Sequence, residues 1–386
     1  MIIAIMAGLW GGIFAASLSF GMLQQRFRSS IEQHVSHVQM HHPEFFKDYN
    51  VKFVLEPWDS LRQQLNEDPD VKAFSGRTRA TGMLASANLT TGVSIFGVSP
   101  EMEAATTGLE QNITEGDYFG EGVRLPILVG RRLADQIKAR PGSRVVLTLL
   151  DATGELTSAS FRVAGIYQTA NLSLDEQNVY VLRSDINELL GLRATVNEVA
   201  VLLDDYEKSE DFAQAYQQNY PDLSVRHWAE ISPELSFLHE MSSFMLMIVL
   251  IIILLALSFG LLNTMLMSVF ERVKELGMLM AIGMNKKRVF LMILLETGFL
   301  TLCGAAAGVL VSLATILIFR QRGLDMAAVG GDTLQEFGFE TVVYPTLEPS
   351  FFGMLTILVI LTAVLTSIYP AMKALRLQPA QAVKEE

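Results

Sequence analysis

The stretch that decides the fold is "ERVKELGMLMAIGMNKKR", residues 271–288, a charged segment between two of the most apolar stretches of the chain. Its periodicity predicts a short amphipathic helix over 271–282, which Gly283 is placed to end. The apolar residues on one side of this helix are Val273, Leu276, Leu279 and Met280. The polar side mixes acidic and basic residues, whereas a helix that binds only anionic lipid usually has a more basic face. The pattern therefore favours a protein partner.

The composition indicates a membrane protein. Of 386 residues, 50% are hydrophobic and 18% are charged, with a net charge of −12, whereas an average soluble domain has about 25% charged residues. Several apolar stretches are long enough to cross a hydrocarbon core of about 30 Å. They are residues 2–23, 244–270, 289–319 and 351–369. We expect four membrane spans.

The basic residues predict the orientation. Lys and Arg cluster in the loop 271–288 and in the C-terminal tail, which places both in the cytoplasm. The predicted order begins with a transmembrane helix over 1–23, an extracytoplasmic domain over 24–238 and a second transmembrane helix over 239–270, with a stalk from about 233. The cytoplasmic loop 271–288 and a third transmembrane helix over 289–319 follow. The chain then has an extracytoplasmic loop over 320–350, a fourth transmembrane helix over 351–372 and a cytoplasmic tail over 373–386.

The second span is predicted to begin well before its apolar core. Ser232 is a candidate N-cap, Pro233 suits the first helical position, and Glu234 lies in the first turn. A continuous helix from Pro233 to Phe270 would be about 57 Å long, nearly twice the hydrocarbon thickness. We expect the excess to project outside the membrane as a stalk.

The large polar segment predicts an α+β domain. "PWDSLRQQLNEDPDVKAFSGRTRATGMLAS" (57–86) and "KSEDFAQAYQQNYPDLSVRHW" (208–228) each indicate a helix followed by a strand, as in a repeated split βαβ unit. Between them, short strands, a turn over 151–154 and one helix over 131–138 predict a β-rich subdomain. The predicted fold class is an α-helical membrane protein with four transmembrane helices and an α+β extracytoplasmic domain.

The histidines near the first span allow a metal-site hypothesis. His34, His37, His41 and His42 lie close together in sequence. However, the alternation in "HVQMH" suits a strand, and no carboxylate-histidine motif follows. We therefore favour a solvated or domain-interface strand over a metal site, and we expect no metal.

The sequence gives no sign of catalytic chemistry. It has no G-x-S-x-G, no H-E-x-x-H and no G-x-x-x-x-G-K-[ST] phosphate loop. The single cysteine, Cys303, excludes an intrachain disulfide, and no basic patch with interleaved aromatics indicates nucleic acid. We expect a non-catalytic chain without a cofactor of its own.

Three residues in the third span are candidates for helix packing. Gly304 and Gly308 have the spacing of close helix contacts, and Glu296 lies about two turns from the cytoplasmic edge. For Glu296 we favour a helix-helix hydrogen bond or an ion pair with a cytoplasmic-side Lys or Arg over a proton or ion relay.

Three stretches together resemble a known family. "GLLNTMLMSVFERVKELGMLMAIGMNKKRVFLMILLE" (260–296) is similar to the second span and coupling loop of permeases of the MacB, FtsX and lipoprotein-releasing (LolC and LolE) type. "SIYPAMKALRLQPAQAVKEE" (367–386) is similar to the end of the same permeases, and "HVQMHHPEF" (37–45) resembles the lipoprotein-releasing branch. The outer domain matches only loosely.

This resemblance implies a permease subunit of a type VII-like ABC transporter, with a MacB-like periplasmic core and a separate ATPase that supplies ATP and Mg²⁺. The segment 271–288 would be the coupling loop. The residues that the resemblance assigns to ATPase coupling are Glu271, Arg272, Glu275, Leu276, Gly277, Ala281 and Gly283, and Asn263 marks helix packing in the membrane-inner half of span two.

Three functions remain open. The first is the transmission of ATPase motion to the outer domain in order to extract or release lipoproteins or another amphiphile from the inner membrane. The alternatives are MacB-like efflux of peptides or drugs and FtsX-like signalling to a cell-wall hydrolase. The expected partners are a cytoplasmic ABC ATPase dimer, a second permease copy or paralogue, membrane lipid, lipoprotein cargo and a periplasmic chaperone or adaptor.

Overall fold

The computed structural model describes residues 2–56, 58–120, 122–169, 172–327, 330, 339, 341–346 and 349–375. Its contacts divide the chain into two units. The helical unit comprises Met1–Gln24, Glu240–Val329 and Thr341–Glu386, and the mixed unit comprises Gln25–His239 and Gly330–Glu340. The last part of the predicted tail, residues 376–386, and most of 328–340 lie outside the described residues.

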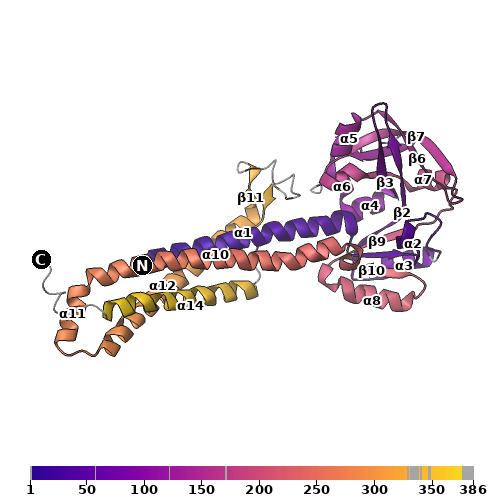
Figure 1. Ribbon diagram of the computed structural model, residues 1–386. Coiled ribbons are helices and arrows are strands. Elements are labelled where there is room, and N and C mark those ends of the chain that lie inside the picture. Colours follow the sequence, from indigo (N-terminus) through magenta and orange to yellow (C-terminus); the bar gives the residue numbers. More distant parts are fainter. Residues whose placement is uncertain are drawn as a thin grey trace. The chain divides into compact units, whose positions relative to one another are not determined.

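Among the described residues, the helical unit contains the long helices and the short helix that Figure 1 labels. They are α1 (Ile2–Ser30), α10 (Pro233–Glu271), α11 (Val273–Ala281), α12 (Lys286–Arg322) and α14 (Pro349–Leu375). The four long helices are apolar and long enough to cross a membrane, and only 17% of the most apolar window of α10 is buried within the chain. Such an exterior is stable in lipid and not in water.

Helix α10 runs without a break over 39 residues. It begins at Pro233, and the carbonyl of Ser232 accepts hydrogen bonds from the N–H groups of Leu235 (3.0 Å) and Ser236 (3.2 Å). Its first residues belong to the mixed unit and the rest to the helical unit. The structure thus has the single helix that the sequence indicated over this segment.

Two interleaved βαβ units form one half of the mixed unit. The strands β1 (Val38–His41), β2 (Val71–Ala85), β9 (Glu198–Leu203) and β10 (Ser224–His227) are antiparallel to their neighbours in the order β10-β1-β9-β2. In this order β1 is parallel to β2, with β9 between them. β9 is likewise parallel to β10, with β1 between them. Helices α3 (Trp58–Glu67) and α8 (Ser209–Asn219) share one buried core with these strands. The predicted split βαβ repeat is confirmed.

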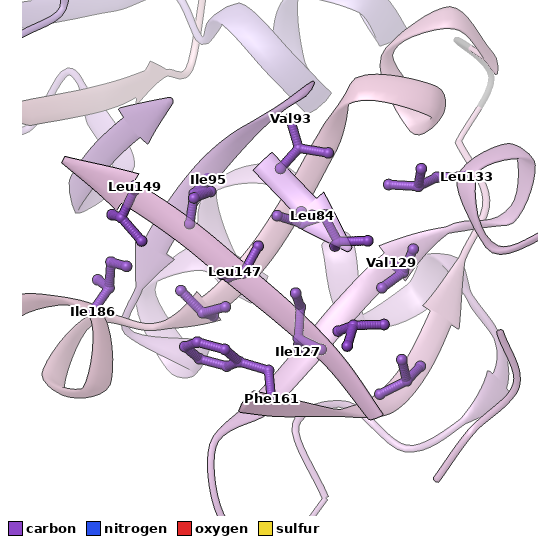
Figure 2. Packing of buried hydrophobic residues seen from close by; sticks show 14 of the residues in the cluster. Leu84, Val93, Ile95, Ile127, Val129, Leu133, Leu147, Leu149, Phe161 and Ile186 are labelled. Atoms are coloured by element: carbon purple, nitrogen blue, oxygen red, sulfur yellow. The ribbon is translucent and has the colours of Figure 1, made fainter. Parts of the chain in front are cut away.

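The other half of the mixed unit is the predicted β-rich subdomain. β2 pairs with β3 (Thr90–Val98), and the sheet continues through β8 (Asn178–Leu182), β5 (Pro126–Gly130), β7 (Leu156–Tyr167) and β4 (Ile113–Gly116). β6 (Arg144–Leu150) pairs with both β2 and β7. Figure 2 shows their aliphatic side chains meeting in one core around Leu147 and Ile127. The predicted helix is α5 (Arg131–Ile137), and α4 (Pro100–Thr107) and α7 (Arg183–Leu190) are additional.

The histidine-containing strand β1 differs from its prediction. It lies between β9 and β10 and all its residues are buried, so the prediction of a solvated strand is wrong. The His41 ring lies 2.9 Å from Gln39 Oε1 and 3.1 Å from the carbonyl of Asn197, and it stacks on Phe45. His37 Nδ1 accepts from the N–H of Leu203 at 3.0 Å. Within the described part of the chain, no three His, Cys, Asp or Glu side chains are grouped as metal ligands.

Candidate functional site

The loop between α10 and α12 folds as a separate short helix. α10 ends at Glu271, the backbone changes direction at Arg272 (φ −102°), and α11 follows from Val273. The helix ends at Ala281 with Ile282 as its C-cap, and Gly283 follows with a φ of +102°, which suits glycine. The N–H of Gly283 bonds to the carbonyl of Met280, and that of Met284 bonds to Leu279, which is the Schellman pattern.

One side of α11 is packed against the rest of the helical unit. Leu276 is 6% exposed and shares a cluster with Val269 of α10, Val289 and Ile293 of α12 and Ala371 of α14. Gly277 is also buried. The assignment of Leu276 and Gly277 to ATPase coupling stays a prediction, and both residues are buried within this chain. Leu276 fixes this side of α11 to the neighbouring helices.

The opposite side of α11 is open. Glu271, Lys274, Glu275, Ala281 and Gly283 are exposed. Between the charged residues lie Met278, which is 53% exposed, and Ile282, which is 86% exposed. An apolar pair with a charged rim is the composition of a protein-protein contact. Sequence reasoning missed Met278 and Ile282, although they are four residues apart, on the opposite side from Leu276 and Met280.

Arg272 connects three helices at the point where α10 ends. Its Nη1 donates to Glu296 Oε1 of α12 at 2.6 Å, and its Nε donates to Glu275 Oε2 of α11 at 3.1 Å. For Glu296, the sequence analysis gave an ion pair with a cytoplasmic-side Lys or Arg as one of the favoured alternatives, and the structure contains that pair with Arg272. Because Arg272 and Glu296 are each about half exposed, the pair fixes geometry more than it adds stability.

The two glycines of α12 contact α1. A Cβ placed on Gly304 would lie 2.9 Å from Ile5 Cβ, and one on Gly308 would lie 3.1 Å from both Leu9 Cβ and the Met6 carbonyl oxygen. These distances are shorter than ordinary side-chain contacts, so larger residues would force the helices apart. Asn263 is exposed on α10 within this chain, and its role in helix packing stays a prediction.

An apolar groove of about 450 Å³ runs between α1 and α10 within the helical unit. Ala7, Gly8, Gly11 and Gly12 line it from α1, and Ile253, Ala256, Leu257, Gly260, Leu261 and Thr264 line it from α10. The glycines and alanines leave the space of the groove, and none of its described lining residues is charged. It suits an acyl chain or an apolar side chain.

A buried charged cluster in the mixed unit was not foreseen from the sequence. Arg77 of β2 donates to both carboxylate oxygens of Glu103 (2.9 and 2.7 Å) and to Glu198 Oε1 at 3.0 Å. All three side chains are almost completely buried. Burial would raise the pKa of Glu198, but the nearby Arg79 and Arg77 hold that pKa below its usual value. The partners are far apart in sequence, so no local pattern reveals them.

These features define a membrane protein with several spans, a packed loop helix and a folded domain inserted between its first two long helices. Residues 247–379 match the family model of the FtsX-like permease C-terminal domain. This part of the chain is therefore an FtsX-like permease domain, and homologues of the chain include MacB, LolC and LolE. The predicted resemblance is confirmed.

Two relatives indicate how far the similarity extends. The lipoprotein-releasing system transmembrane protein LolE of Haemophilus influenzae is 21% identical over 341 residues, which cover 84% of this chain and 80% of that protein. The macrolide export ATP-binding/permease protein MacB of Bdellovibrio bacteriovorus is 27% identical over 165 residues, or 42% of this chain. The chain matches only 22% of the length of that MacB.

The mixed unit also has a distant structural neighbour. The periplasmic region of MacB from Actinobacillus actinomycetemcomitans aligns with a TM-score of 0.38 and 14% identity, covering 55% of this chain and 98% of that structure.

Proposed function

We propose that the chain is the permease subunit of an ABC transporter and receives mechanical work from a separate ATPase at α11. The observation that carries this proposal is the two-sided packing of α11. Its inner side is fixed to α10, α12 and α14, and its outer side presents Met278 and Ile282 within charged residues. A partner that moved this helix would displace the ends of the membrane helices with it.

Arg272 supports the same proposal. A displacement of α11 would reach α12 through the bond from Arg272 to Glu296 and reach α10 through the peptide chain. ATP and Mg²⁺ would bind to the partner. The chain itself would supply no catalytic group.

We further propose that the cargo is a lipoprotein or another amphiphile. The alignments with LolE and LolC extend over most of this chain and most of each relative, whereas those with MacB are shorter. The apolar groove between α1 and α10 would accept an acyl chain. In this assignment the protein spans the inner membrane, with the mixed unit on the extracytoplasmic side and a second permease copy or paralogue beside it.

The coupling proposal is tested by purifying the tagged chain from native membranes in mild detergent, identifying copurifying ATPases and measuring ATP hydrolysis. Met278→Glu is the informative variant, because Met278 is exposed and its replacement breaks no ion pair. We expect a P-loop ATPase with the native chain and much less with Met278→Glu. Glu188→Lys, an exposed change in the mixed unit, is the matched control. Equal ATPase recovery with all three chains would contradict docking at α11.

The cargo proposal is tested separately in proteoliposomes that contain the copurified complex and a fluorescent triacylated lipopeptide. ATP-dependent release of the lipopeptide to a soluble acceptor is expected. Gly11→Leu, which would fill the groove at a position with no neighbour within 4 Å, should reduce release while ATPase copurification persists. Release unaffected by Gly11→Leu would count against the groove as the acyl site.

A further inference from the structure

A second hollow, of about 390 Å³, lies in the mixed unit and has no part in the coupling proposal. One wall is the end of α1 and the following turn of helix, Ile31–Val35. The other wall is the end of α4 and the turn after it, Leu109–Asn112, and Lys72 and Leu202 complete the lining.

Two polar atoms on the first wall lack partners. Ser29 Oγ and Gln33 Oε1 are buried without a hydrogen-bond partner in the described part of the chain. Ser29 is only 9% exposed, and the two residues are four apart, on the same side of the chain's helical path. Buried polar groups are nearly always hydrogen-bonded in folded proteins. Water or a bound ligand must therefore supply the partners of these two atoms.

The lining is rich in side chains that both donate and accept hydrogen bonds. Gln25, Gln33, Gln111 and Asn112 contribute primary amides. A peptide backbone alternates N–H donors and C=O acceptors, so amide side chains match it in both senses. Ala104, Ala105 and Gly108 carry little or no side chain, which leaves room for a backbone to approach the second wall.

The charges argue against a phosphate or a free anion. Arg28 already bonds to Glu32 at 2.6 Å, so its charge is compensated within the wall. The second wall is the carboxyl end of α4, where the helix dipole is negative. Lys72 is the lining cation that has no ion pair among the described residues. One isolated ammonium group suits a single acidic side chain.

We propose that this hollow binds an extended polypeptide segment with an acidic residue opposite Lys72. Amide groups of the two walls pair with the segment's backbone, and Ser29 and Gln33 gain the partners that they lack. The site recognises an unfolded stretch of chain and requires no ATP. The proposal for this hollow is therefore independent of whether α11 binds an ATPase.

The test uses the full-length chain in nanodiscs and two fluorescein-labelled glycine-serine peptides, one with a central aspartate and one with a central lysine. Fluorescence anisotropy should give tighter binding of the aspartate peptide by about tenfold, corresponding to one ion pair of about 1.4 kcal/mol. Lys72→Glu should reverse this preference. Lys52→Glu, at an exposed position outside the hollow, should leave it unchanged.

A second variant separates binding in the hollow from binding elsewhere. Ala105→Trp places a large side chain at an exposed lining position and should abolish the binding of both peptides without lowering the unfolding temperature. The proposal is overturned if both peptides fail to bind the native chain, or if they bind equally to Ala105→Trp. Alternatively, inorganic phosphate could displace the peptides from the native chain but not from Lys72→Glu. That result would make the hollow an anion site and would also overturn the proposal.

Discussion

The two units of this chain are stabilised in opposite ways. The mixed unit buries charged and aromatic polar groups, such as Arg77, Glu103 and His41, and satisfies them with hydrogen bonds. The helical unit leaves most of its apolar surface outside and brings helices together through glycines. Water drives the packing of the first unit, whereas close backbone contact in lipid holds the second. The same substitution should therefore have different consequences in the two units.

The largest effect is expected from breaking the buried charged cluster. Arg77→Met leaves the buried Glu103 without its cation and leaves Glu198 with Arg79 alone, at 3.5 Å, which should destabilise the mixed unit by about 3–5 kcal/mol. Urea unfolding of the full chain in detergent, followed by tryptophan fluorescence, measures this change. Arg131→Met removes the partly exposed pair with Glu115 and should cost no more than about 1 kcal/mol. Equal losses in the two variants would contradict a special role of the buried cluster.

The corresponding change in the helical unit is the enlargement of a contact glycine. Gly304→Val would press a side chain against Ile5 of α1 and should cost about 1–3 kcal/mol through overpacking. The midpoint of SDS-induced unfolding in mixed micelles is the measurement. Gly298→Val lies on the same helix with no neighbour within 4 Å, so it should be nearly neutral. A neutral Gly304→Val would mean that α1 and α12 do not pack closely.

The mixed unit should also lose stability in acid through His41. Burial lowers the pKa of His41 to about 4, although Glu198 lies 3.9 Å away and opposes the shift, while Arg79 and Arg226 add to it. The unfolded chain takes up this proton near pH 6.5, so stability should fall as the pH drops from 6.5 towards 4. The slope from this group is about 1.4 kcal/mol per pH unit.

The control for this prediction is His41→Gln, measured by urea unfolding at several pH values between 7.5 and 4.5. At neutral pH the variant should be less stable because it loses the hydrogen bonds of His41. Its free energy of unfolding should, however, decrease less on acidification than that of the native chain. Parallel curves for the two proteins would rule out His41 as the titrating group.

The smallest effect on stability is expected at Arg272 and Glu296, and here coupling is the more informative measurement. Arg272→Glu alone should cost about 0.2–1 kcal/mol, as for other exposed pairs. In the proposed function it should also weaken the effect of cargo on ATP hydrolysis by the partner. The double variant Arg272→Glu with Glu296→Arg should restore that effect. If the double variant does not restore the effect of cargo on ATP hydrolysis, Arg272 has a role that is independent of Glu296.

The sequence predicted elements that depend on local patterns. The uninterrupted α10, the βαβ repeat and the termination of α11 just before Gly283 follow from periodicity, proline position and glycine. It did not predict the buried state of His37 and His41, because β1 is enclosed by β9 and β10 from much later in the chain. The cluster around Arg77 was missed for the same reason, since Glu103 and Glu198 are 26 and 121 residues away.

The candidate site was foreseen in part. Periodicity separated the two sides of α11, and Glu296 was given a basic partner as one of its alternatives. Which side faces a partner was not determined, because that depends on the ends of α12 and α14 that cover Leu276. Met278 and Ile282 became visible as exposed apolar residues only after that covering was known.

The pairing of β1 with β10 bears on how this protein could have arisen. These are the first and last strands of the mixed unit, and they are direct neighbours, with Val38 opposite His227. The chain therefore enters and leaves the domain at adjacent points, as an inserted domain must if it is not to disturb its host. An ancestor could have gained, lost or exchanged such a domain in one recombination event while its membrane helices kept their connections. Extracytoplasmic domains of different sizes could then be attached to the same membrane part.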